Sequence, residues 1–261
     1  MRKMMLVLCC LFAVSAFGAQ ISDFYVIPVV AHTNGANGTA WRSDVSIQNF
    51  ASTPLNVDMS LIASGEGLLD NITSLPSITV PPGGSVIVPD ILQNQAQTSG
   101  ALLVGANQPF ALTSRTYNRT ANGTFGQTVP PASDVASTGS STIYIPGLIA
   151  NGNFRTNLGL VMSATTTMVV SVTINGASGQ SLGARTFTVP AGATDHVQFG
   201  TTSVAPAPFD IASATIRIAS GKGTVIAYAS IVDNATGDAS FIAGNTAAAG
   251  STAPLRLLLT Q

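Results

Sequence analysis

The segment Leu55–Leu61 reads LNVDMSL and alternates apolar with polar residues. Because successive side chains of a β-strand point to opposite faces, this period of two predicts a strand with one buried face. The segment Met168–Ile174, MVVSVTI, repeats the alternation. Arg42 precedes Leu61 by 19 positions (61 − 42), and Arg155 precedes Ile174 by the same number (174 − 155). The equal spacing predicts two copies of one β unit.

Three more pairs of matching segments extend the repeat in both directions. They are Ile27-Pro28 with Ile145-Pro146, Trp41–Asp44 with Phe154–Asn157, and Val80–Gly83 with Val189–Gly192. We place the first copy at 22–130 and the second at 141–245, with a small, polar linker at 131–141. The C-terminal tail, 246–261, contains the run Leu255–Leu259, which fits either an added edge strand or a sorting or docking segment.

The pattern of the remaining chain favours strands throughout. Short apolar segments rich in Val, Ile and Thr are bounded by Gly, Pro, Asn or Ser, and no segment sustains a helical period. Each copy has the size of an immunoglobulin domain, about 100 residues. We therefore predict an all-β protein built from two tandem immunoglobulin-like antiparallel β-sandwich domains.

The composition narrows the class of partner. The chain is 46% hydrophobic and only 8% charged, which excludes disorder driven by charge. The net charge of −1 provides no field that would attract a polyanion, so we expect no nucleic-acid partner.

Residues 1–19 have the pattern of a signal peptide. Arg2 and Lys3 precede an apolar run at 4–13, and the small residues Ala16, Gly18 and Ala19 follow. We expect cleavage between 16 and 19 and a secreted, periplasmic or cell-surface location, with no transmembrane segment in the mature chain. Both cysteines lie within this segment, so the stability of the mature chain must come from apolar burial.

The motif Trp41-Arg42-Ser43-Asp44 presents two different faces. Trp41 shares its face with Ser43 and the apolar residues beyond it, so we expect the indole in the core, and Phe154 likewise in the second copy.

Arg42 and Asp44 share the opposite face, as do their counterparts Arg155 and Asn157. These polar pairs fit a structural brace, and a role in ligand recognition is the alternative.

Two further groups are candidates for ligand binding. The loop His32–Ala40 is five residues longer than its counterpart and contains His32, Asn34 and Asn37, which fit either a turn with a bonded histidine or a binding loop. Arg115, Tyr117 and Arg119 alternate along one strand and so share one face, where Tyr117 would stack on a polar or anionic glycan.

The catalytic and metal-binding patterns are weak. Gly179–Gly183 matches G-x-S-x-G around Ser181, but it connects two strands instead of leading into a helix, so we interpret it as a turn. His196 lies on a strand, where we expect it to be exposed. The turn Asp233–Asp238 offers oxygen ligands and is a weak calcium candidate through Asp233 and Asp238, although it lacks EF-hand spacing. We assign no catalytic residue, cofactor or metal site.

The motifs carry a resemblance to a known kind of module. Ile27-Pro28 and Trp41–Asp44, together with the closing segment Val232–Asp238, resemble tandem β-sandwich modules of predicted secreted proteins from environmental bacteria. The resemblance implies export, a sandwich fold and a module without catalysis, and it provides no activity to transfer.

These observations favour a non-catalytic exported protein that acts in adhesion, surface structure or protein interaction. Its partner would be an extracellular protein or glycan, with self-association through strand edges. A carbohydrate-binding module pair is the alternative, and a hydrolase with a dispersed active site is the third hypothesis.

Overall fold

The computed structural model describes residues 21–65, 67–121, 123–132, 136–137 and 141–248. Within these ranges the chain forms β-strands and two single-turn 3-10 helices, at Ala36–Gly38 and Thr201–Ser203. All strand ladders are antiparallel, so the predicted all-β antiparallel fold is confirmed. Among the described residues, no helix has the length and apolar character needed to cross a membrane. The signal peptide at 1–19 and the run Leu255–Leu259 lie outside the described residues.

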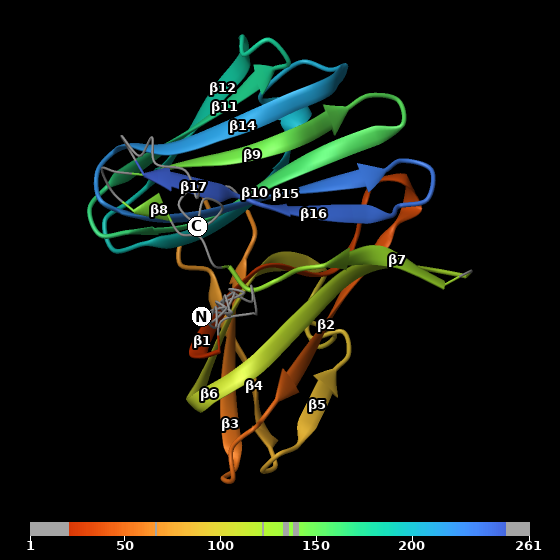
Figure 1. Cartoon of the computed structure of the whole chain (residues 1–261), viewed down its shortest axis with the longest axis vertical. Helices are drawn as coiled ribbons and strands as arrows, with labels where there is room; N and C mark the ends of the chain where they lie inside the picture. The colour runs from red at the N-terminus through yellow and green to blue at the C-terminus, as the bar shows by residue number, and fades with distance from the viewer. Residues whose placement is uncertain (1–20, 66, 122, 133–135, 138–140, 249–261) are drawn as a thin grey trace, which may run out of the picture.

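The first half is a single sheet folded over into two layers (Figure 1). Its strands are β1 (Ser22–Asn34), β2 (Ala40–Gln48), β3 (Leu55–Ala63), β4 (Ile72–Val80), β5 (Ser85–Val88), β6 (Thr98–Thr120) and β7 (Gly123–Thr128). The 23-residue β6 belongs to both layers. It pairs with β1 and β3 up to Phe110, and with β2 and β7 from Ala111 onward. The change of layer follows Pro109, which has no N–H to contribute to a ladder.

The second half has two separate five-stranded sheets. Its strands are β8 (Ala136–Ser137), β9 (Ser141–Ala150), β10 (Phe154–Ala164), β11 (Met168–Gly176), β12 (Ser181–Val189), β13 (Thr194–Gly200), β14 (Phe209–Ser220), β15 (Gly223–Asp233), β16 (Ala239–Ala243) and β17 (Asn245–Ala248). One sheet has the order β13-β10-β15-β16 with β8 beside β15, and the other has the order β12-β11-β14-β9-β17. Here β14 and β15 together correspond to β6, and Gly221 separates them at φ +82°.

The two halves share one strand order. The sheet β4-β3-β6-β1 corresponds to β12-β11-β14-β9, and the layer β5-β2-β6-β7 corresponds to β13-β10-β15-β16. In an immunoglobulin sandwich the first two strands share a sheet. Here β9 and β10 lie in different sheets, and β1 pairs with β2 only at its last two residues. The architecture is a sandwich, but its strand order is not the immunoglobulin one.

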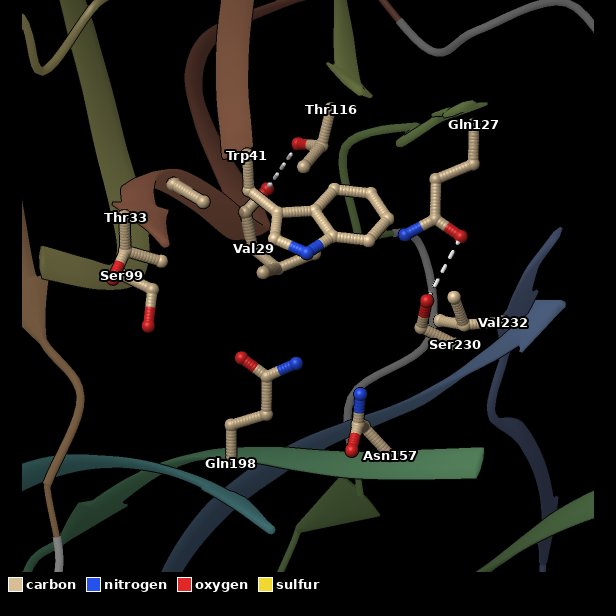
Figure 2. Close-up of a pocket in the computed structure, with 11 residues that line it drawn as sticks. Val29, Thr33, Trp41, Ser99, Thr116, Gln127, Asn157, Gln198, Ser230 and Val232 are labelled. Atoms are coloured by element: carbon tan, nitrogen blue, oxygen red, sulfur yellow. Dashed lines mark hydrogen bonds between the residues drawn. The ribbon is translucent and has the colours of Figure 1, made fainter. Parts of the chain in front are cut away.

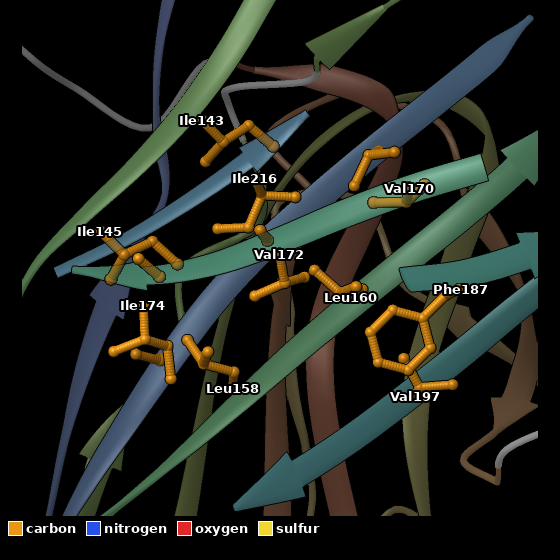
Figure 3. Packing of buried hydrophobic residues seen from close by; sticks show 14 of the residues in the cluster. Ile143, Ile145, Leu158, Leu160, Val170, Val172, Ile174, Phe187, Val197 and Ile216 are labelled. Carbon is orange, nitrogen blue, oxygen red and sulfur yellow. The ribbon is translucent and has the colours of Figure 1, made fainter. Parts of the chain in front are cut away.

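The alternating strands supply the cores. In β11 the residues Met168, Val170, Val172 and Ile174 are fully buried, and in β3 the residues Leu55, Val57, Met59 and Leu61 are at most 3% exposed. Figure 3 shows the apolar side chains of β11 facing those of β10 across the second half. Burying one such side chain stabilises the fold by about 1.5–3 kcal/mol.

The outer face of the sheet β13-β10-β15-β16 packs against the first half. Tyr228 on β15 is fully buried and belongs to the hydrophobic cluster of the first half, while Leu69 packs against the core of the second. Ile62 and Ala101 form a further cluster with Val161 of β10. The two halves therefore form one packed body, and we call this contact the junction.

The junction also buries a histidine. His196 on β13 is fully buried, and its Nε2 lies 3.2 Å from the hydroxyl oxygen of Tyr228. The expectation that His196 is exposed is wrong, because strand alternation cannot show that the other half covers the outer face of this sheet. Burial lowers the pKa of His196 to about 4, although the backbone carbonyl of Pro28 partly opposes the shift. His196 is therefore neutral at pH 7.

The buried histidine predicts a loss of stability in acid. Its folded-state pKa of about 4 lies below the usual 6.5, so between these values the unfolded state binds more protons than the folded state. The free energy of unfolding should fall by about 3 kcal/mol on this account as the pH falls from 7 to 4. His196→Gln removes the titration and should reduce the fall accordingly in urea denaturation measured across this range. Equal losses in the two proteins would contradict the assignment.

Candidate functional site

The two motif aromatics lie outside the cores. Trp41 and Phe154 are both half-buried and belong to no core cluster, so their predicted core positions are wrong. Trp41 is the second residue of β2 and Phe154 the first of β10. At these strand ends the alternation continues, but the opposing layer no longer covers the side chain.

The third residue of the motif is the buried anchor in both copies. The Ser43 hydroxyl accepts a hydrogen bond from the Ala31 N–H at 2.8 Å and lies 2.7 Å from the Thr116 hydroxyl. Thr156 accepts from the Ile149 N–H at 3.1 Å. Ala31 and Ile149 hold the same repeat position, four residues after Ile27 and Ile145. Each hydroxyl ties the second strand of its copy to the first. The sequence could have indicated this anchor, because both copies have a hydroxyl residue at this motif position, on the strand face that alternation predicts to be buried.

Arg42, Asp44 and His32 form a network with Asp90. The Asp90 carboxylate lies 2.9 Å from His32 Nδ1 and 3.3 Å from Arg42 Nε, and the Asp90 N–H donates to Asp44 Oδ1 at 2.9 Å. These contacts hold the loop after β5 on the outer face of β2. Sequence reasoning missed Asp90 because it lies 46 residues from Asp44, in a loop without a pattern.

Tyr117 is buried beneath its neighbours. It is 3% exposed, its hydroxyl donates to Asp44 Oδ1 at 3.1 Å, and the Arg115 guanidinium lies 5.0 Å from its ring centroid. On the other side β7 places Gly126 opposite Tyr117, where a Cβ would collide with it. The prediction that Tyr117 stacks on a glycan is therefore wrong. Arg119 on the same face is exposed.

Burial raises the pKa of Tyr117, so its phenol stays protonated at neutral pH. Arg115 donates to the hydroxyl and the carbonyl oxygen of Thr124. These bonds direct Arg115 along the sheet.

The turn at Asp233–Asp238 is closed by its own side chains. Asp233 Oδ1 accepts from the N–H groups of Ala235 and Thr236 at 2.8 Å, which lowers the pKa of Asp233. Asp238 Oδ1 accepts a hydrogen bond from the Ala239 N–H. In the described ranges, no three His, Cys, Asp or Glu residues are grouped as metal ligands, so the calcium candidate gains no support.

This turn instead packs on the first half. Asn118 Nδ2 donates to the Thr236 carbonyl at 3.4 Å. Gly237 has φ +71°, and a Cβ there would lie 2.8 Å from Thr39. The second-copy pair differs from the first, since Arg155 donates to Asn234 Oδ1 at 2.8 Å and Asn157 lines the junction.

The extra loop of the first copy holds Trp41. The indole Nε1–H donates to Thr39 Oγ1 at 2.9 Å. Gly35 lies against the same edge of the ring, where a Cβ would be 2.6 Å from Nε1. Asn34 and Asn37 are exposed, and Asn37 adopts a left-handed conformation with φ 57°. The loop therefore orients the indole.

A cavity of about 80 Å³ lies beside Trp41 between the halves. Its walls are Val29, Ala31, Thr33, Trp41, Ser99, Thr116 and Gln127 from the first half, and Asn157, Gln198, Ser230 and Val232 from the second. Figure 2 shows the amides of Asn157 and Gln198 directed toward the indole from the opposite wall. This cavity is the candidate functional site.

The G-x-S-x-G segment is a hairpin connection. β11 and β12 pair antiparallel, with Asn175 opposite Ser181, and Ser181 begins a strand, not a helix. The segment therefore lacks the strand-to-helix turn of a nucleophile elbow.

Comparison with known proteins found similar solved structures but no matching family. No protein-family model matches the chain, and no curated protein matches it. The chain is similar to the crystal structure of PBSX exported protein XepA, with 12% identity over 82% of this chain and 85% of that one, at a TM-score of 0.26. It is also similar to a structure of infectious bursal disease virus Gx strain, with 9% identity, coverage of 88% and 68%, and a TM-score of 0.20. Such low TM-scores carry no argument about the site.

The hydroxyl anchor gives a stability prediction. Ser43→Ala leaves the Ala31 N–H without its acceptor in a fully buried position, so the free energy of unfolding should fall by about 1–3 kcal/mol. Ser46→Ala, on the opposite face of β2, is the matched control and should change it by less than about 0.5 kcal/mol. Chemical denaturation at pH 7 measures both. Equal effects would show that Ser43 is no anchor.

Proposed function

We propose that the protein is exported and acts without catalysis in adhesion, surface structure or protein interaction. The signal-peptide pattern at 1–19 and the resemblance to secreted sandwich modules support export. The absence of catalysis is supported by the contacts of the ionisable side chains His32 on β1 and Arg42 and Asp44 on β2. His32 and Arg42 contact the Asp90 carboxylate in the β5–β6 loop, and Asp44 accepts a hydrogen bond from the N–H of the same residue. These contacts stabilise the fold.

The open edge of β12 is the observation that carries the proposal. β12 is nine residues long and ends its sheet, so in the described part of the chain it pairs only with β11. It contains no proline, and its one charged residue is Arg185. The Arg185 guanidinium lies 4.9 Å from the ring centroid of Phe187 and 5.6 Å from that of Phe199, which keeps the charge at the rim between the sheets. An unprotected edge can accept a strand from another chain.

The edge strand of the first half is better protected. β4 also has nine residues, but Pro76 lies at its middle, and the β3–β4 register shifts between Val57 and Met59. A proline and an irregular register both hinder strand addition. Strand-by-strand association is therefore expected at β12.

Lysines on β12 test this proposal. Thr186 and Thr188 are exposed on β12, and the double change Thr186→Lys, Thr188→Lys places two charges on the edge. We expect light scattering after size exclusion to show association of the mature protein at high concentration, and its loss in the double variant. Thr165→Lys, in the β10–β11 turn, should leave association intact. A mature protein that stays monomeric at every concentration and binds neither cells nor matrix would overturn the proposal.

A further inference from the structure

We propose that the cavity beside Trp41 binds one neutral sugar unit, with groups from both halves contacting it. This site goes beyond association at β12, and it differs from the face containing Tyr117, which burial excludes. The inference rests on the unused hydrogen-bonding groups of the cavity, its aromatic wall, its size and its lack of charge.

Several polar groups in the cavity have no protein partner. Within the described ranges, the side-chain amides of Asn157 and Gln198 make no hydrogen bond to other residues, and neither does the Ser99 hydroxyl. Gln127 is 7% exposed and accepts from Ser230 through Oε1 at 3.1 Å, while its amide NH₂ has no partner in the same ranges. Asn157, Gln198 and Ser99 are only partly buried, so their polar groups can bond to a ligand that enters the cavity.

The remaining wall suits a sugar ring. Because the Trp41 N–H already donates to Thr39, the indole offers its apolar surface to the cavity. Aromatic rings pack well against apolar surfaces such as the C–H face of a sugar. Amide side chains both donate and accept, which matches hydroxyl groups that do the same.

The volume and charge limit the ligand further. A cavity of 80 Å³ holds roughly five to eight waters at about 10–15 Å³ each, which is close to the size of one monosaccharide. No cavity wall residue is ionisable, so a charged ligand would be desolvated without a partner. A neutral sugar, free or at the end of a glycan, meets both limits.

Trp41 itself reports on occupancy, because it is the only tryptophan in the chain. We expect titration of the mature protein with a panel of neutral monosaccharides to give a saturable change in tryptophan emission for at least one of them. Asn157→Ala and Gln198→Ala should each weaken that sugar's binding about three- to tenfold, the value of one hydrogen bond. Gln93→Ala changes an exposed glutamine outside the cavity and should leave binding unchanged.

The result has clear alternatives. The proposal is overturned if no neutral sugar gives a saturable change. It is also overturned if the Asn157→Ala and Gln198→Ala variants bind the sugar as tightly as the unchanged protein, once thermal unfolding shows that the variants fold. Saturation by an uncharged capped tripeptide and by none of the sugars would overturn it in favour of a peptide ligand. Association through β12 is measured separately, so either proposal can fail without the other.

Discussion

The junction is the contact on which the rest of the structure depends. It buries Tyr228 and His196 on the outer face of a sheet that would otherwise meet water. A glycine on β10 makes room for this packing, since a Cβ at Gly159 would lie 2.0 Å from the Tyr228 ring. The loop that orients Trp41 and the turn at Asp233–Asp238 both lie at this contact. The two copies of the repeat therefore pack into one body.

The differences between the copies gather at the junction. Both copies keep the hydroxyl anchor, but only the first has the long loop and the tryptophan. Asp44 anchors the loop at Asp90, whereas its counterpart Asn157 lines the cavity. Because Asn157 has an amide where Asp44 has a carboxylate, the cavity wall has no charge at this position. Because of this asymmetry, the two copies contribute different side chains to one cavity.

Sequence reasoning was most successful where a residue's neighbours lie on the same strand or the next one. The alternation in Leu55–Leu61 and Met168–Ile174 predicted the buried faces, because period two is a local property. It failed for Tyr117 and His196 because alternation assigns a side chain to a face without telling what covers that face. β7 covers Tyr117, and the other half of the chain covers His196.

The candidate site was harder to predict than the fold. Trp41 and Asn157 were singled out for their motif, but their meeting with Gln198 depends on how the halves pack. No local pattern encodes that packing. The strand order was not predicted for a similar reason. β6 passes from one layer to the other, and in the sequence only Pro109 marks this change.

The central claim is that the two halves form one cooperative body through the junction. Differential scanning calorimetry of the mature protein tests it most directly. A single transition, with equal calorimetric and van't Hoff enthalpies, is the predicted result. Two separable transitions, each with the enthalpy of one half, would contradict the account.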